Sequence, residues 1–266
     1  LKRYDSATIV IKLGGAAMSN IDNLSSFARD IVLMKQCKVN PIIIHGGGPM
    51  INSALEKSGV NFDFIDGKRV TDENAVKIVE MVLSGDLNKT IVSSINSQGG
   101  SGVGISGKDA SLVICEKDQP KLGFVGKPVL INTKLITTLV ENDFIPVISP
   151  IGTNEKGETF NINADTMAGS IASALKADRL LLLTDVSGVK DKNGDKVDKA
   201  SLKEIKKLIN QNIIKDGMIP KVNTATDAIA KGVRAVVILD GSIQNACLLE
   251  LFTDHGVGTL IREEID

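Results

Sequence analysis

The chain has 266 residues, enough for one large α/β unit or two modest lobes around a sizeable core. Its 31 basic and 32 acidic residues are interspersed and leave a net charge of −1, which argues against nucleic-acid and membrane partners. No apolar run approaches the length that spans a bilayer, and the N-terminal sequence lacks the pattern of a signal peptide. The widely spaced Cys37, Cys115 and Cys247 are typical of free thiols in a reducing compartment. We therefore expect a soluble, cytoplasmic protein.

Strand-like apolar runs alternate with helical patterns from the N-terminus onward. This alternation predicts an α/β fold with a largely parallel central sheet. In the first half, the expected strands are 8–13, 41–45, 102–106, 112–116 and 144–149, the expected helices are 20–37, 49–58, 72–98 and 132–142, and hairpin-like segments cover 60–70 and 123–131.

The second half continues the same alternation. The expected helices are 163–177, 201–210 and 220–231, and the expected strands are 178–185, 234–240 and 258–261. A further helix is expected between the last two strands, and a polar hairpin turn lies around Asn193 and Gly194. The best internal boundary lies near Ala177 and separates residues 1–177 from residues 178–266 as two sheet-forming halves. A sheet that continues through both halves would leave no flexible linker there.

Open α/β sheets bind ligands at the carboxyl ends of their parallel strands, and several unusual residue patterns fall at these ends. Lys12 lies near the end of the first strand and is followed by Gly14 and Gly15. An unpaired buried lysine is costly, so Lys12 either reaches solvent or faces an anion. A Gly-Gly turn offers backbone N–H groups to phosphate oxygens without obstruction by side chains. A simple turn beside an exposed lysine explains this pattern equally well.

Three consecutive glycines, Gly46 to Gly48, separate the second strand from a helix whose first turn contains Pro49. They fit neither the Walker phosphate loop nor the dinucleotide fingerprint. They also exceed the single glycine that a tight turn needs. The free N–H groups and the positive dipole end of this helix favour an anionic ligand that contacts the main chain. His45 is typical of a hydrogen-bonded core histidine, and we assign it no chemistry.

Two further patterns place polar groups near predicted helix starts. Asn161, Asn163 and Asp165 alternate where a strand runs into a helix, and a helix cap accounts for only one of them. Pro220 begins another predicted helix, and Lys221 follows in its first turn, where a cation is mildly unfavourable. A negative ligand near Lys221 would remove that conflict, although an exposed lysine would also tolerate it.

The two glycine turns, the two lysines and the carboxylate indicate a small anionic substrate that meets a polyphosphate. Phosphoryl transfer depends mainly on positioning and on charge stabilisation, which glycine loops and lysines supply. Asp165 can hold Lys12 and Lys221 in place by ion pairing. The sequence lacks both the Walker lysine loop and the catalytic motifs of protein kinases, which excludes the two common kinase architectures.

The segments "KLGGAAM", "HGGGPMI", "GKRVTD", "GISGKD", "NINADTMAG", "TDVSGV" and "GMIPKV" occur in this order, and with them the chain resembles the amino acid kinase family along almost its whole length. The resemblance implies a three-layer α-β-α sandwich around one eight-stranded, mainly parallel sheet. It implies that residues 1–177 bind N-acetyl-L-glutamate and form a dimer contact, and that residues 178–266 bind ATP. The implied reaction phosphorylates the γ-carboxylate of N-acetyl-L-glutamate, the second step of arginine and ornithine biosynthesis. Mg²⁺ would be held mainly by the ATP phosphates, and no protein ligand is assigned to it.

The resemblance also implies roles for individual residues. Lys12 and Lys221 would stabilise the transferring phosphoryl group, and Asp165 would orient them. Arg69 would bind the α-carboxylate of the substrate. The implied substrate contacts are Gly47, Gly48, Arg69, Asn161 and Asn163, and the implied ATP contacts are Gly14, Gly15, Thr184, Asp185, Val186, Ser187, Gly188, Val189, Gly217, Met218 and Pro220.

Arginine-inhibited members of the family usually carry a cation and a histidine where this chain has Ser242 and Asn245, although Glu250 is retained. We therefore expect weak or absent inhibition by arginine. The resemblance implies at least a homodimer, leaves a hexamer open, and includes a nitrogen-signalling regulator protein among the candidate partners. The alternatives are a carrier-protein-linked aminoadipate or glutamate kinase of lysine biosynthesis and a non-catalytic regulatory member. The lysines and the carboxylate of the predicted site argue against the second alternative.

Overall fold

The computed structural model describes residues 4–18, 20–65 and 67–265. Its main sheet contains β1 (Thr8–Leu13), β2 (Asn40–His45), β5 (Gly102–Ser106), β8 (Ile145–Ser149), β11 (Arg179–Thr184), β12 (Lys199–Ser201), β13 (Val236–Asp240) and β14 (Thr259–Arg262). The strand order is β12-β14-β13-β11-β1-β2-β8-β5, and every pair except β13–β14 is parallel. This confirms the predicted α/β fold and mainly parallel sheet. Because β1 pairs with β11, the sheet continues past the expected boundary near Ala177.

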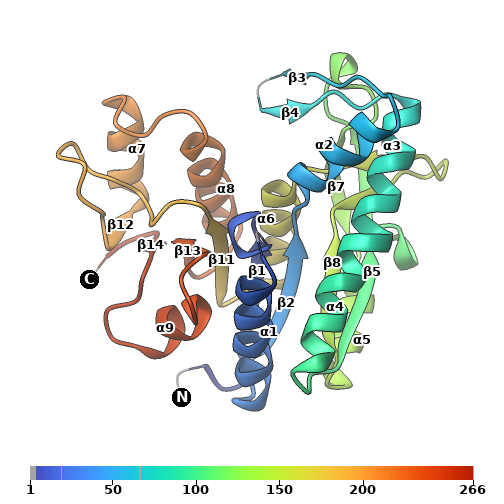
Figure 1. Cartoon of the computed structure of the whole chain (residues 1–266). Coiled ribbons are helices and arrows are strands. Elements are labelled where there is room, and N and C mark those ends of the chain that lie inside the picture. The colour runs from blue at the N-terminus through green and yellow to red at the C-terminus, as the bar shows by residue number, and fades with distance from the viewer. Residues whose placement is uncertain (1–3, 19, 66, 266) are drawn as a thin grey trace.

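Helices cover both faces of this sheet, which confirms the three-layer sandwich (Figure 1). One face packs against α1 (Ile21–Gln36), α4 (Asn88–Ser97) and α9 (Ala246–Phe252), and the other packs against α5 (Lys134–Glu141), α6 (Ala164–Leu175), α7 (Leu202–Asn210) and α8 (Met218–Ala230). In β1, Ile9, Ile11 and Leu13 belong to the first core and Val10 to the second, because successive side chains alternate between faces. Lys12 therefore lies on the side of α6 and α8.

Smaller elements lie beyond the carboxyl ends of the central strands (Figure 1). They include α2 (Gly48–Lys57), α3 (Glu73–Glu80) and the hairpin of β3 (Phe64–Ile65) and β4 (Lys68–Arg69). A second sheet of order β10-β9-β6-β7 contains β6 (Val113–Lys117), β7 (Gly126–Ile131), β9 (Ile151–Thr153) and β10 (Thr159–Asn161). Short 3₁₀ helices cover Ala16–Met18, Asp109–Ser111 and Pro120–Leu122. The predicted edge segment 123–131 supplies β7, which is the outer strand of the second sheet.

Three details differ from the sequence-based prediction. The helix expected over 72–98 is divided, because a π-helical segment, Met81–Leu87, separates α3 from α4. The helix expected to begin at Pro220 begins at Met218, so the proline lies inside the first turn. β9 and β12 were not predicted, because strands of 3 residues carry no recognisable alternation.

Candidate active site

Lys12, Asp165 and Lys221 form one ion-paired cluster. Lys12 Nζ lies 3.0 Å from Asp165 Oδ1, and Lys221 Nζ lies 3.0 Å from Asp165 Oδ2. The three residues come from β1, α6 and α8. The two helices approach closely at Gly169 of α6, where a Cβ would lie only 2.8 Å from Cγ2 of Thr224 in α8. The structure thus contains the ion pairing that the sequence suggested for Asp165.

This lysine–aspartate cluster is nearly buried and carries a net positive charge. The side chains of Lys12, Asp165 and Lys221 are 12%, 11% and 16% exposed. Burial by itself would raise the pKa of Asp165, but the two lysine charges outweigh it and hold this pKa below its ordinary value. The carboxylate is therefore ionised at neutral pH and is shared by two ammonium groups. The remaining positive charge in a largely water-excluded site attracts an anion.

The first glycine turn lies beside this cluster, and its two glycines differ in their surroundings. A Cβ on Gly14 would lie 2.3 Å from the carbonyl oxygen of Leu183 and 3.5 Å from Lys12 Nζ. Glycine is therefore needed here so that the turn can pass against β11. A Cβ on Gly15 would have no neighbour within 4 Å among the described residues outside the adjacent chain. The backbone at Gly15 is thus accessible to a ligand.

The second glycine turn shows the same division. A Cβ on Gly47 would lie 2.6 Å from Cδ2 of Leu83 and 2.9 Å from Cδ2 of Leu87, so packing against the π-helical segment requires glycine. Gly48 begins α2 and has open space in front of its Cα, with no described neighbour within 4 Å beyond the adjacent chain. No described side chain caps this helix start, so its first N–H groups are available to an anion.

Arg69 of β4 is buried without a carboxylate partner among the described residues. Its guanidinium packs against the rings of Phe62 and Phe64, each centred 4.7 Å from Cζ, and these two rings contact each other edge to face. Nη2 donates a 2.5 Å hydrogen bond to Oδ1 of Asn52, whereas Nη1 has no hydrogen-bond partner in the described part of the chain. Burial lowers the pKa of Arg69, but a guanidinium remains charged in proteins. An unpaired donor on a buried guanidinium suits a carboxylate ligand.

A cavity of about 210 Å³ joins this arginine to the second glycine turn. It is lined by all the expected substrate contacts, namely Gly47, Gly48, Arg69, Asn161 and Asn163. Asn161 Nδ2 donates to Oγ1 of Thr71 at 3.3 Å, and Asn163 caps α6 by accepting the N–H of Thr166 at 3.1 Å. Ala164, which precedes Asp165 in α6, also lines the cavity. The cavity therefore extends from the unpaired guanidinium to the start of α6, next to Asp165 in the chain, although Lys12, Asp165 and Lys221 do not themselves line it.

Besides Gly14 and Gly15 after β1, the expected ATP contacts lie at the carboxyl end of β11 and at the start of α8. Thr184 ends β11, and its hydroxyl donates to Asp185 Oδ1 at 3.0 Å. The side chains of Asp185 and Val186 are exposed, and that of Ser187 is half-buried. Gly217 precedes α8, and the first N–H groups of the helix, those of Met218 and Ile219, donate to the carbonyl oxygens of Lys215 and Asp216, each at 3.1 Å. Pro220 lines a second cavity, of about 350 Å³, which shares Asn163 with the first.

Gly188 and Val189 have a structural environment that the sequence did not indicate. The N–H of Val189 donates to Oγ1 of Thr259 at 2.9 Å, and the Val189 side chain is fully buried. Gly188 has φ +144°, and a Cβ there would lie 2.4 Å from the same hydroxyl oxygen. These two residues therefore fix the loop to β14, and the preceding residues are the ones that face outward.

His45 is a core histidine, as the sequence suggested. Its ring is fully buried, and Nδ1 donates to the carbonyl oxygen of Gly46 at 2.9 Å. Nε2 accepts from the amide of Asn88 at 3.2 Å, which fixes the tautomer. Burial lowers the pKa of His45 to about 4, so the ring is neutral at physiological pH.

Sequence reasoning missed the residues that support the predicted contacts. Asn52 lies in α2 and holds Arg69, but no motif distinguishes it from other polar residues on that helix. The Thr71 hydroxyl donates to the carbonyl oxygen of Arg69 at 3.0 Å and accepts from Asn161, so it links two expected substrate contacts. Its position directly after "GKRV" is the one signal that could have pointed to it.

The segment expected to bear on arginine inhibition forms several hydrogen bonds with neighbouring parts of the protein. The Ser242 hydroxyl donates to Asp240 Oδ1 at 2.7 Å, and Asn245 N–H donates to the hydroxyl of Ser26 at 3.3 Å. Glu250 Oε2 accepts the N–H groups of the loop before β14 at 2.8 and 3.0 Å. Weak or absent arginine inhibition stays a prediction.

The described residues contain neither a metal-binding cluster of acidic, histidine and cysteine side chains nor a membrane-spanning helix. Within 4–18, 20–65 and 67–265, no group of three or more His, Cys, Asp or Glu side chains is arranged to hold a metal ion. Over the same ranges, no helix combines the length and the apolar character that crossing a membrane requires.

Comparison with known proteins shows the family. The sequence profile of the amino acid kinase family matches residues 7–240. Acetylglutamate kinase from Dinoroseobacter shibae is 58% identical over 98% of this chain and 91% of that protein, and the enzyme of that name from Ruegeria pomeroyi is 57% identical over 99% and 92%. The solved structure of smu.665 from Streptococcus mutans has a TM-score of 0.82 at 32% identity, covering 97% of this chain and 99% of that one. The chain belongs to the amino acid kinase family and, within it, to the acetylglutamate kinase family.

Proposed function

We propose that this protein transfers the γ-phosphoryl group of ATP to the γ-carboxylate of N-acetyl-L-glutamate, giving ADP and N-acetyl-L-glutamyl 5-phosphate, in the second step of arginine and ornithine biosynthesis. The observation that carries the proposal is the carboxylate of Asp165 shared by two lysines beside a cavity with an unpaired guanidinium. Curated relatives at 54–58% identity are named acetylglutamate kinase, which favours this acceptor over a carrier-linked one.

The chemistry needs charge stabilisation rather than a general base. A glutamate-type γ-carboxylate has an ordinary pKa of about 4.3, so it is ionised at neutral pH without help. One of its oxygens forms the new bond to phosphorus as the bond to the bridging oxygen of ADP breaks. Lys12 and Lys221 stabilise the negative charge on the transferring group and on the leaving oxygen. Asp165 keeps both ammonium groups in place.

The acceptor occupies the cavity that the expected substrate contacts line. Arg69 Nη1 binds the α-carboxylate, because it is the buried donor that lacks a protein partner among the described residues. The amides of Asn161 and Asn163 and the free N–H groups at the start of α2 supply polar contacts to the rest of the molecule. The γ-carboxylate then points toward Asp165 and its two lysines.

ATP lies across Thr184–Ser187, Gly217–Pro220 and the accessible turn at Gly15. The accessible backbone at Gly15 and the nearby ammonium groups of Lys12 and Lys221 suit phosphate oxygens. Within Gly217–Pro220, the N–H groups of Met218 and Ile219 already donate to the carbonyl oxygens of Lys215 and Asp216. The nearby carboxylate of Asp165 has both oxygens in ion pairs, so this donor set suits anions better than a bare cation. Mg²⁺ would accordingly be held mainly by the ATP phosphates, and no protein ligand is assigned to it.

Trapping of the acyl phosphate tests the proposal. Purified enzyme, Mg-ATP and hydroxylamine should convert N-acetylglutamate into a hydroxamate and should leave glutamate and N-acetylaminoadipate largely unreacted. Lys12→Met serves as the inactive control, and Lys77→Met, which alters an exposed ion pair on α3, serves as the active control. No hydroxamate from N-acetylglutamate, with clear product from another acceptor, would overturn the assignment.

The proposal includes a division of labour between two lobes. Residues 1–177 bind the acceptor and dimerise, and residues 178–266 bind ATP. In support, β1, β2, β8 and β5 adjoin one another on one side of the sheet, and β5 is the outer strand across which a homodimer, or a hexamer built from dimers, would pair. Sedimentation of a monomer alone would contradict this. A cytoplasmic location, which the free thiols of Cys115 and Cys247 favour, and a nitrogen-signalling regulator protein as partner belong to the same proposal.

A further inference from the structure

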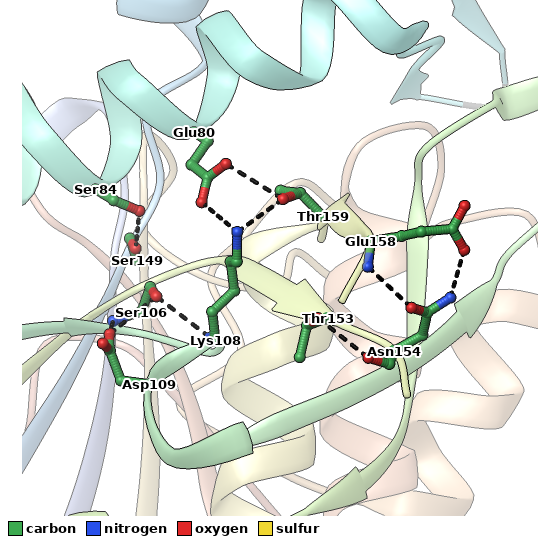
Figure 2. Close-up of polar contacts among 10 residues, drawn as sticks. All are labelled: Glu80, Ser84, Ser106, Lys108, Asp109, Ser149, Thr153, Asn154, Glu158 and Thr159. Carbon is green, nitrogen blue, oxygen red and sulfur yellow. Dashed lines mark hydrogen bonds and ion pairs between the residues drawn. The ribbon is translucent and has the colours of Figure 1, made fainter. Parts of the chain in front are cut away.

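A closed polar triangle lies outside the lysine–aspartate cluster and joins three separate elements (Figure 2). Lys108 Nζ lies 2.9 Å from both Glu80 Oε1 and Thr159 Oγ1, and it donates to both. The Thr159 hydroxyl in turn donates to Glu80 Oε2 at 3.2 Å. Each side chain thus contacts the other two, and we call this set the Glu80–Lys108–Thr159 triad. Glu80 ends α3, Thr159 begins β10, and Lys108 lies two residues beyond β5.

The backbone of Lys108 is anchored to the main sheet. Its N–H donates to the hydroxyl of Ser106, the last residue of β5, at 3.2 Å. The N–H and hydroxyl of Ser106 both donate to Asp109 Oδ2, at 2.6 and 2.9 Å (Figure 2). This turn is therefore held at both ends. The lysine side chain acts as an arm that extends from a fixed point of the sheet to α3 and β10.

The triad connects directly to an acceptor contact through β10. Thr159 and Asn161 are two residues apart in a strand, so their side chains lie on the same face. Asn161 bonds to Thr71, which precedes α3, while Thr159 bonds to Glu80, which ends α3. β10 is thus tied to both ends of this helix. The triad therefore fixes the position of β10, and this position determines where the Asn161 amide lies at the acceptor cavity.

The triad also borders the π-helical segment that packs on the second glycine turn. Glu80 directly precedes Met81–Leu87, and Leu83 and Leu87 of this segment leave no room for a side chain on Gly47. On the other side, the Ser84 and Ser149 hydroxyls lie 2.7 Å apart (Figure 2). π-Helical turns occur frequently at functional sites, where they re-aim neighbouring groups. Here the segment is held by Glu80 at its start and by Ser84 in its middle.

We propose that the Glu80–Lys108–Thr159 triad is a positioning device for the acceptor pocket, which fixes β10 and the π-helical segment so that Asn161 and Gly47 face the bound acceptor. The inference rests on the proposed kinase function. Lys12 and Lys221 lie on β1 and α8, which contribute nothing to the triad. Disruption of the triad therefore weakens acceptor binding and leaves ATP affinity and the phosphoryl-transfer step nearly unchanged.

Steady-state kinetics of Lys108→Met tests this. Because the side chains of Lys108 and Glu80 are about one-third exposed, loss of the triad should raise KM for N-acetylglutamate only about three- to fivefold, with KM for ATP and kcat within about twofold of the parent. Lys108→Arg keeps a cationic donor and should restore most of the affinity. Adding Glu80→Gln to Lys108→Met should cost little more, because the triad acts as a unit. Lys77→Met removes another ion pair from α3 and should match the parent.

Amide hydrogen exchange gives a readout that does not depend on activity. The N–H of Asn161 donates to the carbonyl oxygen of Phe124 at 2.9 Å, and its exchange should accelerate in Lys108→Met but not in Lys77→Met. Exchange at Leu181, in the centre of the main sheet, should not change. Unchanged exchange at Asn161, or equal rises in KM for both substrates, would overturn the inference. If the parent enzyme does not phosphorylate N-acetylglutamate, the proposed function is wrong. Amide hydrogen exchange at Asn161 in the parent and in Lys108→Met still decides whether the triad positions β10.

Discussion

Replacing Asp165 with asparagine distinguishes positioning of the lysines from simple neutralisation of their charge. Asp165→Asn keeps the shape of the side chain but removes the charge that two ammonium groups approach at 3.0 Å. If Asp165 positions Lys12 and Lys221, their mutual repulsion moves them apart, and kcat falls about 10²-fold or more. If Asp165 only neutralises charge, the more positive site should bind ATP more tightly and leave kcat almost unchanged.

The same substitution should lower stability by a measurable amount. Removing one partner of a buried ion pair costs about 3–5 kcal/mol. Asp165 retains 11% exposure, which places the expected loss at the lower end of that range, about 3 kcal/mol. For a chain of this length, that corresponds to a decrease in Tm of about 6–12 °C. Calorimetry with sulfate should recover part of the decrease, because the anion replaces the missing charge. A variant with kcat within about threefold of the parent and an unchanged Tm would refute the reasoning.

Three further predictions follow from the site and the core. Lys12→Met and Lys221→Met should each lower kcat by about 10²-fold or more when ADP formation with N-acetylglutamate is measured. A variant that changes only KM and keeps kcat would contradict their role. Arg69→Ala should raise KM for N-acetylglutamate about 10- to 100-fold, because a carboxylate clamp acts equally in ground and transition states, and an effect on KM for ATP alone would contradict it. Burial lowers the pKa of His45 from 6.5 to about 4, so between these pH values the unfolded chain binds more protons than the folded one. The contribution of His45 to stability is therefore complete above pH 6.5 and decreases as pH falls toward 4. Urea unfolding of the parent and of His45→Gln at pH 7 and pH 5 measures this contribution. If the free energy of unfolding falls equally between the two pH values in both proteins, the prediction is wrong.

Sequence patterns predicted the main sheet because its central strands carry their own signal. β1, β2 and β11 are nearly continuous apolar runs, which is the pattern of strands buried on both faces. The π-helical segment Met81–Leu87 carries no such signal. Its sequence continues the helical pattern of α3, and its widened turn is associated with contacts to Gly47 and Ser149, which lie far away in the chain. Tertiary packing decides this local geometry, so a local pattern could not reveal it.

The candidate site likewise contains residues that a local sequence pattern reveals and residues that it does not. Lys12, Asp165 and Lys221 each occupy a position that is unfavourable or unexplained within its own element, and that local conflict is visible in a sequence. Arg69 entered only through the resemblance to a family, since nothing near it in the chain distinguishes it from an exposed arginine. The sequence did place Phe62 and Phe64 nearby, but their positions around the guanidinium depend on the β3–β4 hairpin and on α2.

The shared carboxylate also explains how two lysines can lie side by side in this site. Two buried ammonium groups without Asp165 would attract phosphates strongly, but their repulsion and desolvation would leave them poorly ordered. Attraction that is equal in the ground and transition states does not raise kcat, whereas donors held where charge develops do raise it. The charge of Asp165 weakens the attraction of the two lysines for anions in the ground state. In exchange, Asp165 holds both ammonium groups 3.0 Å from its own oxygens. The net positive charge that remains is then available to the phosphoryl group as its bonds change.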